Sequence, residues 1–224
     1  MSADPDATRR NGDQQPSVGR LLSLSDGVVA IALTLLVLQL RVPPLHEVAD
    51  QNSAADLATQ LGRGGDQLIS YAISFFIIAQ FWLIHHRVFR QISAHQEGLA
   101  WWNFAFLFTI TVMPFASALL GSYSQNPLAV DIFAFNLLLA SLATLVTLKL
   151  GQRRGLLALH ATPRSVRIGE LRSITGVAIL AVSMALAWVS PDGAKYLWLL
   201  IAVVPHFVTR WYERRNASAA QPAG

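Results

Sequence analysis

The sequence has no cysteine and few charged residues, and both shortages restrict what the chain can be. Without cysteine it can form no disulfide, no thiolate nucleophile and no thiolate metal site. Only 13% of its 224 residues are Asp, Glu, Lys or Arg, and 53% are hydrophobic. Average soluble domains carry about 25% charged residues. The composition therefore indicates an all-α integral membrane protein.

Catalytic and metal-binding patterns are also missing. The sequence contains no HExxH, no GxSxG and no His-xxx-His spacing. His85 and His86 are adjacent, and adjacent side chains on a helix do not converge on one ion. We expect no metal, no cofactor and no enzymatic activity. The net charge is +4, but the basic residues flank apolar runs, which fits lipid headgroups and not nucleic acid.

Long apolar runs dominate what is present, and we interpret them as six membrane spans. The last run is short, and Lys195 and Arg210 extend it by reaching toward the interfaces. Pro43 and Pro44 should stop the first helix, Pro114 and Pro205 should kink theirs, and a short helix is expected near 54–61. The predicted spans are 21–40, 68–84, 99–120, 132–148, 173–190 and 196–209.

The distribution of basic residues predicts the topology. Lys and Arg number three up to Arg20, two after the second span, six from Lys149 to Arg172, and three near the C-terminus. Only three of the seventeen basic residues fall on the other side. Basic residues favour cytoplasmic loops, so both termini should be cytoplasmic. We expect a six-helix domain over 20–212, between tails 1–19 and 213–224.

The first run, Leu21–Leu40, contains one charge, Asp26. A carboxylate inside a span costs about 2.5–3.5 kcal/mol on insertion scales, so Asp26 should have a partner. The alternative is an interfacial Asp that starts the helix beside Ser23 and Ser25.

A helical wheel divides this run into two faces. One stripe of about 100° carries Leu24, Ile31, Thr34, Leu35, Leu38 and Val42, and Asp26 lies roughly 140° from Ile31. Because the helix is apolar all round, periodicity alone leaves open whether this stripe faces lipid, the bundle core or a pore.

The ordered pattern Arg20-xxx-Leu24-Ser25-Asp26-Gly27, followed by Ala30-Ile31-Ala32 and 34–38 (TLLVL), resembles the R-xxx-FSDG signature of the endolysosomal-type potassium channel family in its bacterial single-repeat form. Leu24 stands where the family usually has Phe. The resemblance extends into 75–89 and 103–123.

The resemblance implies a potassium channel whose first helix lines the pore. Ile31 would form the narrowest apolar constriction, with Thr34, Leu35 and Leu38 as further pore-facing positions. A single repeat implies a homotetramer in the plasma membrane. No TVGYG filter is present, so selectivity would come from a hydrophobic filter, and protons could also pass.

The resemblance also implies a polar network near the cytoplasmic side that holds the pore helix. Trp82 and His85 share a helix face at i and i+3, whereas we expect His86 to point elsewhere. Without the resemblance, an interfacial belt of aromatic residues and histidine explains this face equally well. The members of the network would be Arg20, Ser25, Asp26, Trp82 and His85.

Two other classes of protein stay open. A secondary transporter would normally show inverted repeats with broken helices, and the sequence shows no convincing repeat. An intramembrane enzyme would use Asp26 with His85 and His86, and would need a further converging group.

Overall fold

The computed structural model describes residues 18–44, 50, 52–93, 97–159, 161–198, 200, 201, 207 and 210. These residues are almost entirely helical, with one isolated β-bridge between Ile92 and Leu157. The elements are α2 (Val18–Leu35), the 3-10 helix η1 (Leu36–Gln39), α3 (Ala54–Arg63), α4 (Gly65–Arg90), α5 (Glu97–Ser122), α6 (Pro127–Arg153) and α7 (Pro163–Ala187).

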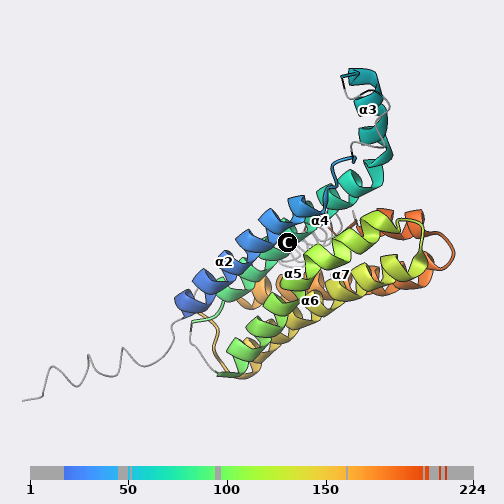
Figure 1. Cartoon of the computed structure of the whole chain (residues 1–224). Helices are drawn as coiled ribbons and strands as arrows, with labels where there is room; N and C mark the ends of the chain where they lie inside the picture. The colour runs from blue at the N-terminus through green and yellow to red at the C-terminus, as the bar shows by residue number, and fades with distance from the viewer. Residues whose placement is uncertain are drawn as a thin grey trace, which may run out of the picture.

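The long helices run side by side in an elongated bundle, and α3 projects from one end (Figure 1). Five segments of the described chain are long and apolar enough to cross a membrane: α2 with η1, α4, α5, α6 and α7. The protein is therefore an all-helical, multi-pass membrane protein. Residues 191–198 form another helical segment. Much of the predicted sixth span, Pro205 included, lies outside the described residues, so the count of six stays a prediction.

The starts of three helices follow from local capping. Asn126 and Thr162 cap α6 and α7 with their side-chain oxygens, and Pro127 and Pro163 occupy the first helical positions. Proline suits that position because its missing amide would be unpaired there in any case. Ser53 caps α3 by accepting a hydrogen bond from the Asp56 amide. The short helix expected near 54–61 is confirmed.

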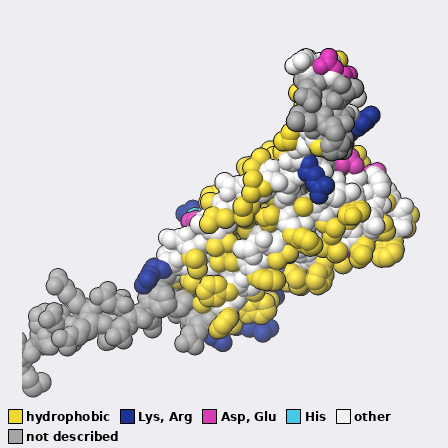
Figure 2. Space-filling view, in the orientation of Figure 1, with side chains coloured by type: hydrophobic (Ala, Val, Ile, Leu, Met, Phe, Trp, Pro, Cys, Tyr) yellow, Lys and Arg dark blue, Asp and Glu magenta, His cyan; other side chains and the backbone are white. Residues whose placement is uncertain are grey.

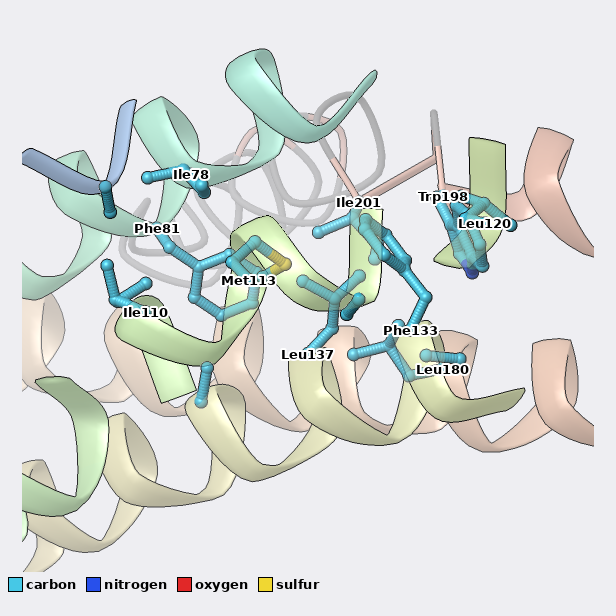
Figure 3. Close-up of a cluster of buried hydrophobic side chains, with 14 of the residues drawn as sticks. Ile78, Phe81, Ile110, Met113, Leu120, Phe133, Leu137, Leu180, Trp198 and Ile201 are labelled. Carbon is cyan, nitrogen blue, oxygen red and sulfur yellow. The ribbon is translucent and has the colours of Figure 1, made fainter. Parts of the chain in front are cut away.

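The main core lies where α4, α5 and α6 meet. Large buried side chains along it include Phe81, Met113, Phe133 and Leu137, and Trp198 closes one end against Phe133 (Figure 3). The ring centroids of Phe133 and Trp198 are 4.8 Å apart. A smaller cluster around Val88, Ile92, Leu99, Leu148, Leu156 and Val166 fills the other end of the bundle.

Helix α5 continues through Pro114. A neighbouring helix supplies a donor in the preceding turn, because Asn136 Nδ2 of α6 donates to the Thr109 carbonyl at 2.9 Å. The carbonyl that the missing Pro114 amide would have bound is that of Ile110, four residues back, so compensation at Pro114 itself stays a prediction. A kink at Pro114 stays a prediction.

Basic side chains gather more densely at one end of the bundle than at the other, where Lys195 is paired with Asp192. Arg87, Arg90, Arg153 and Arg154 all lie at the end where α4 and α6 finish. Asp66 and Asp192 lie at the opposite end, where Ser124 and Gln125 bind them. Hydrophobic side chains are spread over the visible face between the ends (Figure 2). This distribution matches the basic-side count made from the sequence.

Candidate pore helix and its polar network

One face of α2 and η1 is buried in the bundle. Leu21, Ser25, Val29, Ala32 and Leu36 are buried, at spacings of three or four residues. Val29 is 3% exposed and Leu36 is fully buried. Because 3.6 residues make one turn, these side chains form a continuous stripe that packs on α4 and α5.

The opposite face is the stripe that the helical wheel selected. Ile31 is 60% exposed and Leu38 is 75% exposed, and Thr34 is exposed between them. Leu24 and Leu35 are also exposed on this side. The stripe therefore has no partner within the described part of this chain, and it offers a row of apolar side chains to lipid or to a neighbouring subunit.

The first helix ends earlier than expected, and its last turn is a 3-10 helix. We expected a helix up to Pro43, but η1 ends at Gln39 and Leu40 is extended, with φ −72° and ψ 113°. The wheel therefore does not apply to Val42, whose place on the stripe was wrong. A 3-10 helix has three residues per turn, so the turn at η1 brings Leu35 and Leu38 closer to alignment than an α-helix would.

The Thr34 hydroxyl can act toward a further group only as a hydrogen-bond acceptor or a ligand. Its hydroxyl donates to the Ile31 carbonyl at 2.8 Å, one turn back on the same helix. The lone pairs of the oxygen are then left for an acceptor role, which suits a cation and not an anion.

Asp26 has the partner that its position requires. The indole Nε1 of Trp82 on α4 donates to Asp26 Oδ1 at 2.7 Å. A donor of this kind lowers the cost of an ionised carboxylate in a membrane span. Asp26 lies on α2, so this hydrogen bond joins α2 to α4.

His85 lies beside this pair but turns toward α5. Its Nε2 is 2.7 Å from Asn103 Oδ1, and Ser25 Oγ lies 3.1 Å from the same oxygen. The imidazole is stacked on Phe106 with ring centroids 4.4 Å apart. Ser25, His85 and Asn103 therefore join α2, α4 and α5 at one buried point.

Four of the five predicted network residues thus fall into two adjacent groups: Asp26 bonds Trp82 directly, and Ser25 and His85 are joined through Asn103. Arg20 is exposed and makes no hydrogen bond or ion pair with another described residue. His86 was expected to point elsewhere, which was wrong. Its ring centroid is 5.7 Å from that of Trp82, because residues four apart are neighbours on a helix.

Asn103 is the residue that the sequence reasoning missed. It is the only amide side chain in the uncharged run 99–120, and it is fully buried. A lone polar residue in an apolar helix normally faces a partner in the bundle, so this pattern could have revealed it. Among the described residues, no group of three or more His, Cys, Asp or Glu side chains could hold a metal ion.

Comparison with known families identifies a similarity over the same part of the chain. The model of the family described as "Endosomal/lysosomal potassium channel TMEM175" matches residues 20–114. The first part of the chain is therefore similar to the TMEM175 family. The matched stretch contains the exposed stripe up to Leu38 and every member of the polar network, including Asn103.

Individual TMEM175 relatives agree. The chain is 34% identical to "Potassium channel Cha6605_3372" of Chamaesiphon minutus, over 52% of this chain and 55% of that protein. It is 27% identical to mouse "Endosomal/lysosomal proton channel TMEM175", over 58% of this chain and 25% of that protein. The match thus spans just over half the length of this bacterial relative. Both relatives are named as channels and not as enzymes.

The fold similarity extends beyond the sequence match. The crystal structure of a "lysosomal potassium-selective channel TMEM175 homolog" from Chamaesiphon minutus superposes with a TM-score of 0.73 at 25% identity, covering 86% of this chain and 97% of that chain. The TMEM175 likeness therefore includes α6 and α7, which lie outside the region of the family match.

Proposed function

We propose that this protein is a potassium-selective, leak-type cation channel of the plasma membrane, formed by four copies of the chain around a central axis. Both termini would be cytoplasmic, as the distribution of basic residues suggests. The observation that carries the proposal is the exposed apolar stripe on α2, which bears Ile31, Thr34, Leu35 and Leu38 in the part of the chain related to potassium channels.

A closed ring of copies explains why this stripe is bare. Identical chains usually assemble with closed symmetry, and four copies of α2 around an axis would place their bare stripes toward one another. The opposite face of α2 is fixed to α4 and α5 by burial and by the polar network. The network would thus set the rotation of α2 and keep Ile31 directed at the axis.

Selectivity in such a pore follows from dehydration. Four Ile31 side chains would form an apolar collar, and an ion entering it loses water without gaining a charged ligand. Potassium holds its water less tightly than sodium, so it loses less. Just beyond the collar, the Thr34 oxygens would offer lone pairs to the ion, since their protons are donated to the Ile31 carbonyls.

Ion flux in liposomes tests this function. Purified protein reconstituted under a potassium gradient should give unsaturable potassium flux, with a sodium gradient as the control. Flux that saturates with ion concentration would point to a secondary transporter, and no flux at all would contradict both. Proton entry, followed with an internal pH dye, tests whether the same pore also conducts protons.

Crosslinking tests the assembly. Single cysteines at Leu38 in this cysteine-free chain should crosslink between copies, because the stripe faces the axis. Cysteine at Val29, on the buried face, is the matched control and should not crosslink. Because one cysteine can link only two chains, the number of copies is counted separately by amine crosslinking of the wild type with glutaraldehyde: a ladder that reaches four chains fits the tetramer, whereas one that stops at two contradicts it.

A further inference from the structure

Two adjoining cavities lie on α4. The first, of about 30 Å³, lies between α4, α6 and α7. The second, of about 190 Å³, lies along α4 against Trp198. Gln80, Phe81 and Ile201 line both cavities, so the two adjoin at these residues. Phe81, Ile201 and Trp198 appear in this order along the bundle in Figure 3.

The first cavity is lined mainly by apolar groups, and its polar lining includes two arginines. Arg87 of α4 and Arg172 of α7 line it from two helices, together with the hydroxyls of Ser141 and Ser173. None of the described residues that line it is acidic. Guanidinium groups bind phosphate oxygens through charge-assisted hydrogen bonds, so this end of the cavity suits an anion.

Gly176 keeps the first cavity open. A Cβ atom placed there would lie 3.9 Å from Ser141 Oγ, so a methyl group would fit and a larger side chain would occupy the cavity.

The second cavity is apolar, and Ile77 in its lining lies at a depth that an acyl chain can reach from Arg87. Ala72, Ile73, Phe76 and Ile77 of α4 line it. Ile77 is ten residues from Arg87, or about 15 Å along the helix axis. That distance equals about half of the hydrocarbon thickness of a bilayer, which is the depth that one acyl chain reaches.

We propose that these cavities form a binding site for one anionic phospholipid, with its phosphate at Arg87 and Arg172 and an acyl chain along α4 past Ile77. Basic pockets between membrane helices on the cytoplasmic side are typical sites for anionic headgroups. Arginines at the cavity favour an anionic lipid over a second copy of the chain, because the apolar surface of a second copy would not need a cation to bind. The proposal requires a membrane-embedded bundle and does not rest on channel activity.

Native mass spectrometry of the full-length protein tests the site. Delipidated protein is mixed with phosphatidylglycerol or with phosphatidylcholine, and retained lipid is counted per chain. Wild type should retain phosphatidylglycerol preferentially. Arg87→Gln and Arg172→Gln should each weaken retention about fivefold, the ratio expected for one arginine near an anionic lipid surface. Arg167→Gln is the matched control, because this exposed arginine of α7 does not line the cavity.

Two filling variants make the test independent of the arginines. Gly176→Leu should block the first cavity and Ile77→Trp the second, and both should reduce phosphatidylglycerol retention while the thermal melt stays cooperative. Equal retention of the two lipids by wild type, or wild-type retention in Arg87→Gln, would overturn the proposal. Displacement of phosphatidylglycerol by millimolar inorganic phosphate in wild type, with Ile77→Trp unaffected, would instead indicate a free-anion site. Loss of oligomer in Ile77→Trp with lipid retention unchanged would place a second copy there.

Discussion

Removing the indole donor of Trp82 should loosen the pore helix from the bundle. Trp82 Nε1 donates to Asp26 Oδ1 at 2.7 Å, and no other described residue donates to that carboxylate. In Trp82→Phe, Asp26 loses this hydrogen bond. This loss weakens the attachment of α2 to α4, and the Ser25–Asn103 contact and the buried stripe of α2 are left to fix the helix.

The size of this effect can be bounded. Hydrogen bonds to charged groups contribute about 1.5–3 kcal/mol in proteins generally. Interhelical polar contacts in membranes average about 0.6 kcal/mol, with a maximum near 1.7 kcal/mol. Because the acceptor is a carboxyl oxygen and the bond is short, we expect the upper part of the membrane range, about 1.5 kcal/mol. That corresponds to a change of about tenfold in an equilibrium constant.

A double-mutant cycle measures this coupling directly. The unfolding free energy is determined in SDS-titrated micelles for wild type, Asp26→Asn, Trp82→Phe and the double variant. Trp101→Phe is the matched control, because Trp101 is exposed on α5 and contacts only Phe104 among the aromatic rings described. A coupling energy below about 0.3 kcal/mol would show that the Asp26–Trp82 bond does not hold the helix. A variant that assembles normally but loses potassium preference would show instead that these residues line the pore.

Three further predictions follow from other contacts. Asn103→Leu should lower the unfolding free energy of the bundle by about 1–3 kcal/mol, because His85 and Ser25 lose their shared partner. Arg20→Ala should lower the unfolding free energy much less. Thermal melts of the two variants measure the difference. A reporter fused to the C-terminus should be active in the cytoplasm, and one inserted after Gly64 should be active outside; the reverse pattern would contradict the topology. Hydrogen bonds from Lys195 and Gln125 lower the pKa of Asp192 in the folded protein. The ionised Asp192 therefore stabilises the fold above the ordinary pKa near 4, and this stabilisation is lost as the pH falls through the lower pKa of the folded state. Asp192→Asn should therefore melt slightly earlier than wild type at pH 7, by less than about 1 kcal/mol because the pair is exposed, with the difference disappearing in acid.

The sequence predicts the helices and the division of α2 into two faces for physical reasons. Apolar runs of bilayer length define the five observed spans, and a period of 3.6 residues separates buried Val29 from exposed Ile31. Pairing Asp26 with a partner also follows from the cost of a charge in a span. The family resemblance supplied Trp82 as that partner, and the structure confirms the contact.

What the sequence could not give depends on three-dimensional packing. A wheel assumes one helical twist, so it fails at Val42, where η1 has already ended. Contacts with α2 and α5 determine which helix each polar side chain of α4 faces. The structure was therefore needed to show that Trp82 faces α2 while His85 faces Asn103 on α5. The assignment of the bare stripe to a pore also lies beyond a single chain, because the neighbours that would surround it are other copies.

The central claim is that Ile31 forms the constriction, and Ile31→Asn tests it most directly. Reversal potential and current are measured under potassium and sodium gradients and normalised to protein in the membrane. Replacing the apolar collar with amides should raise conductance and reduce discrimination between potassium and sodium, with Leu35→Asn acting in the same direction more weakly. Val29→Asn, on the buried face, should impair assembly without raising current. If Ile31→Asn leaves current and reversal potential unchanged while a substitution on another face alters selectivity, the stripe assigned here does not line the pore.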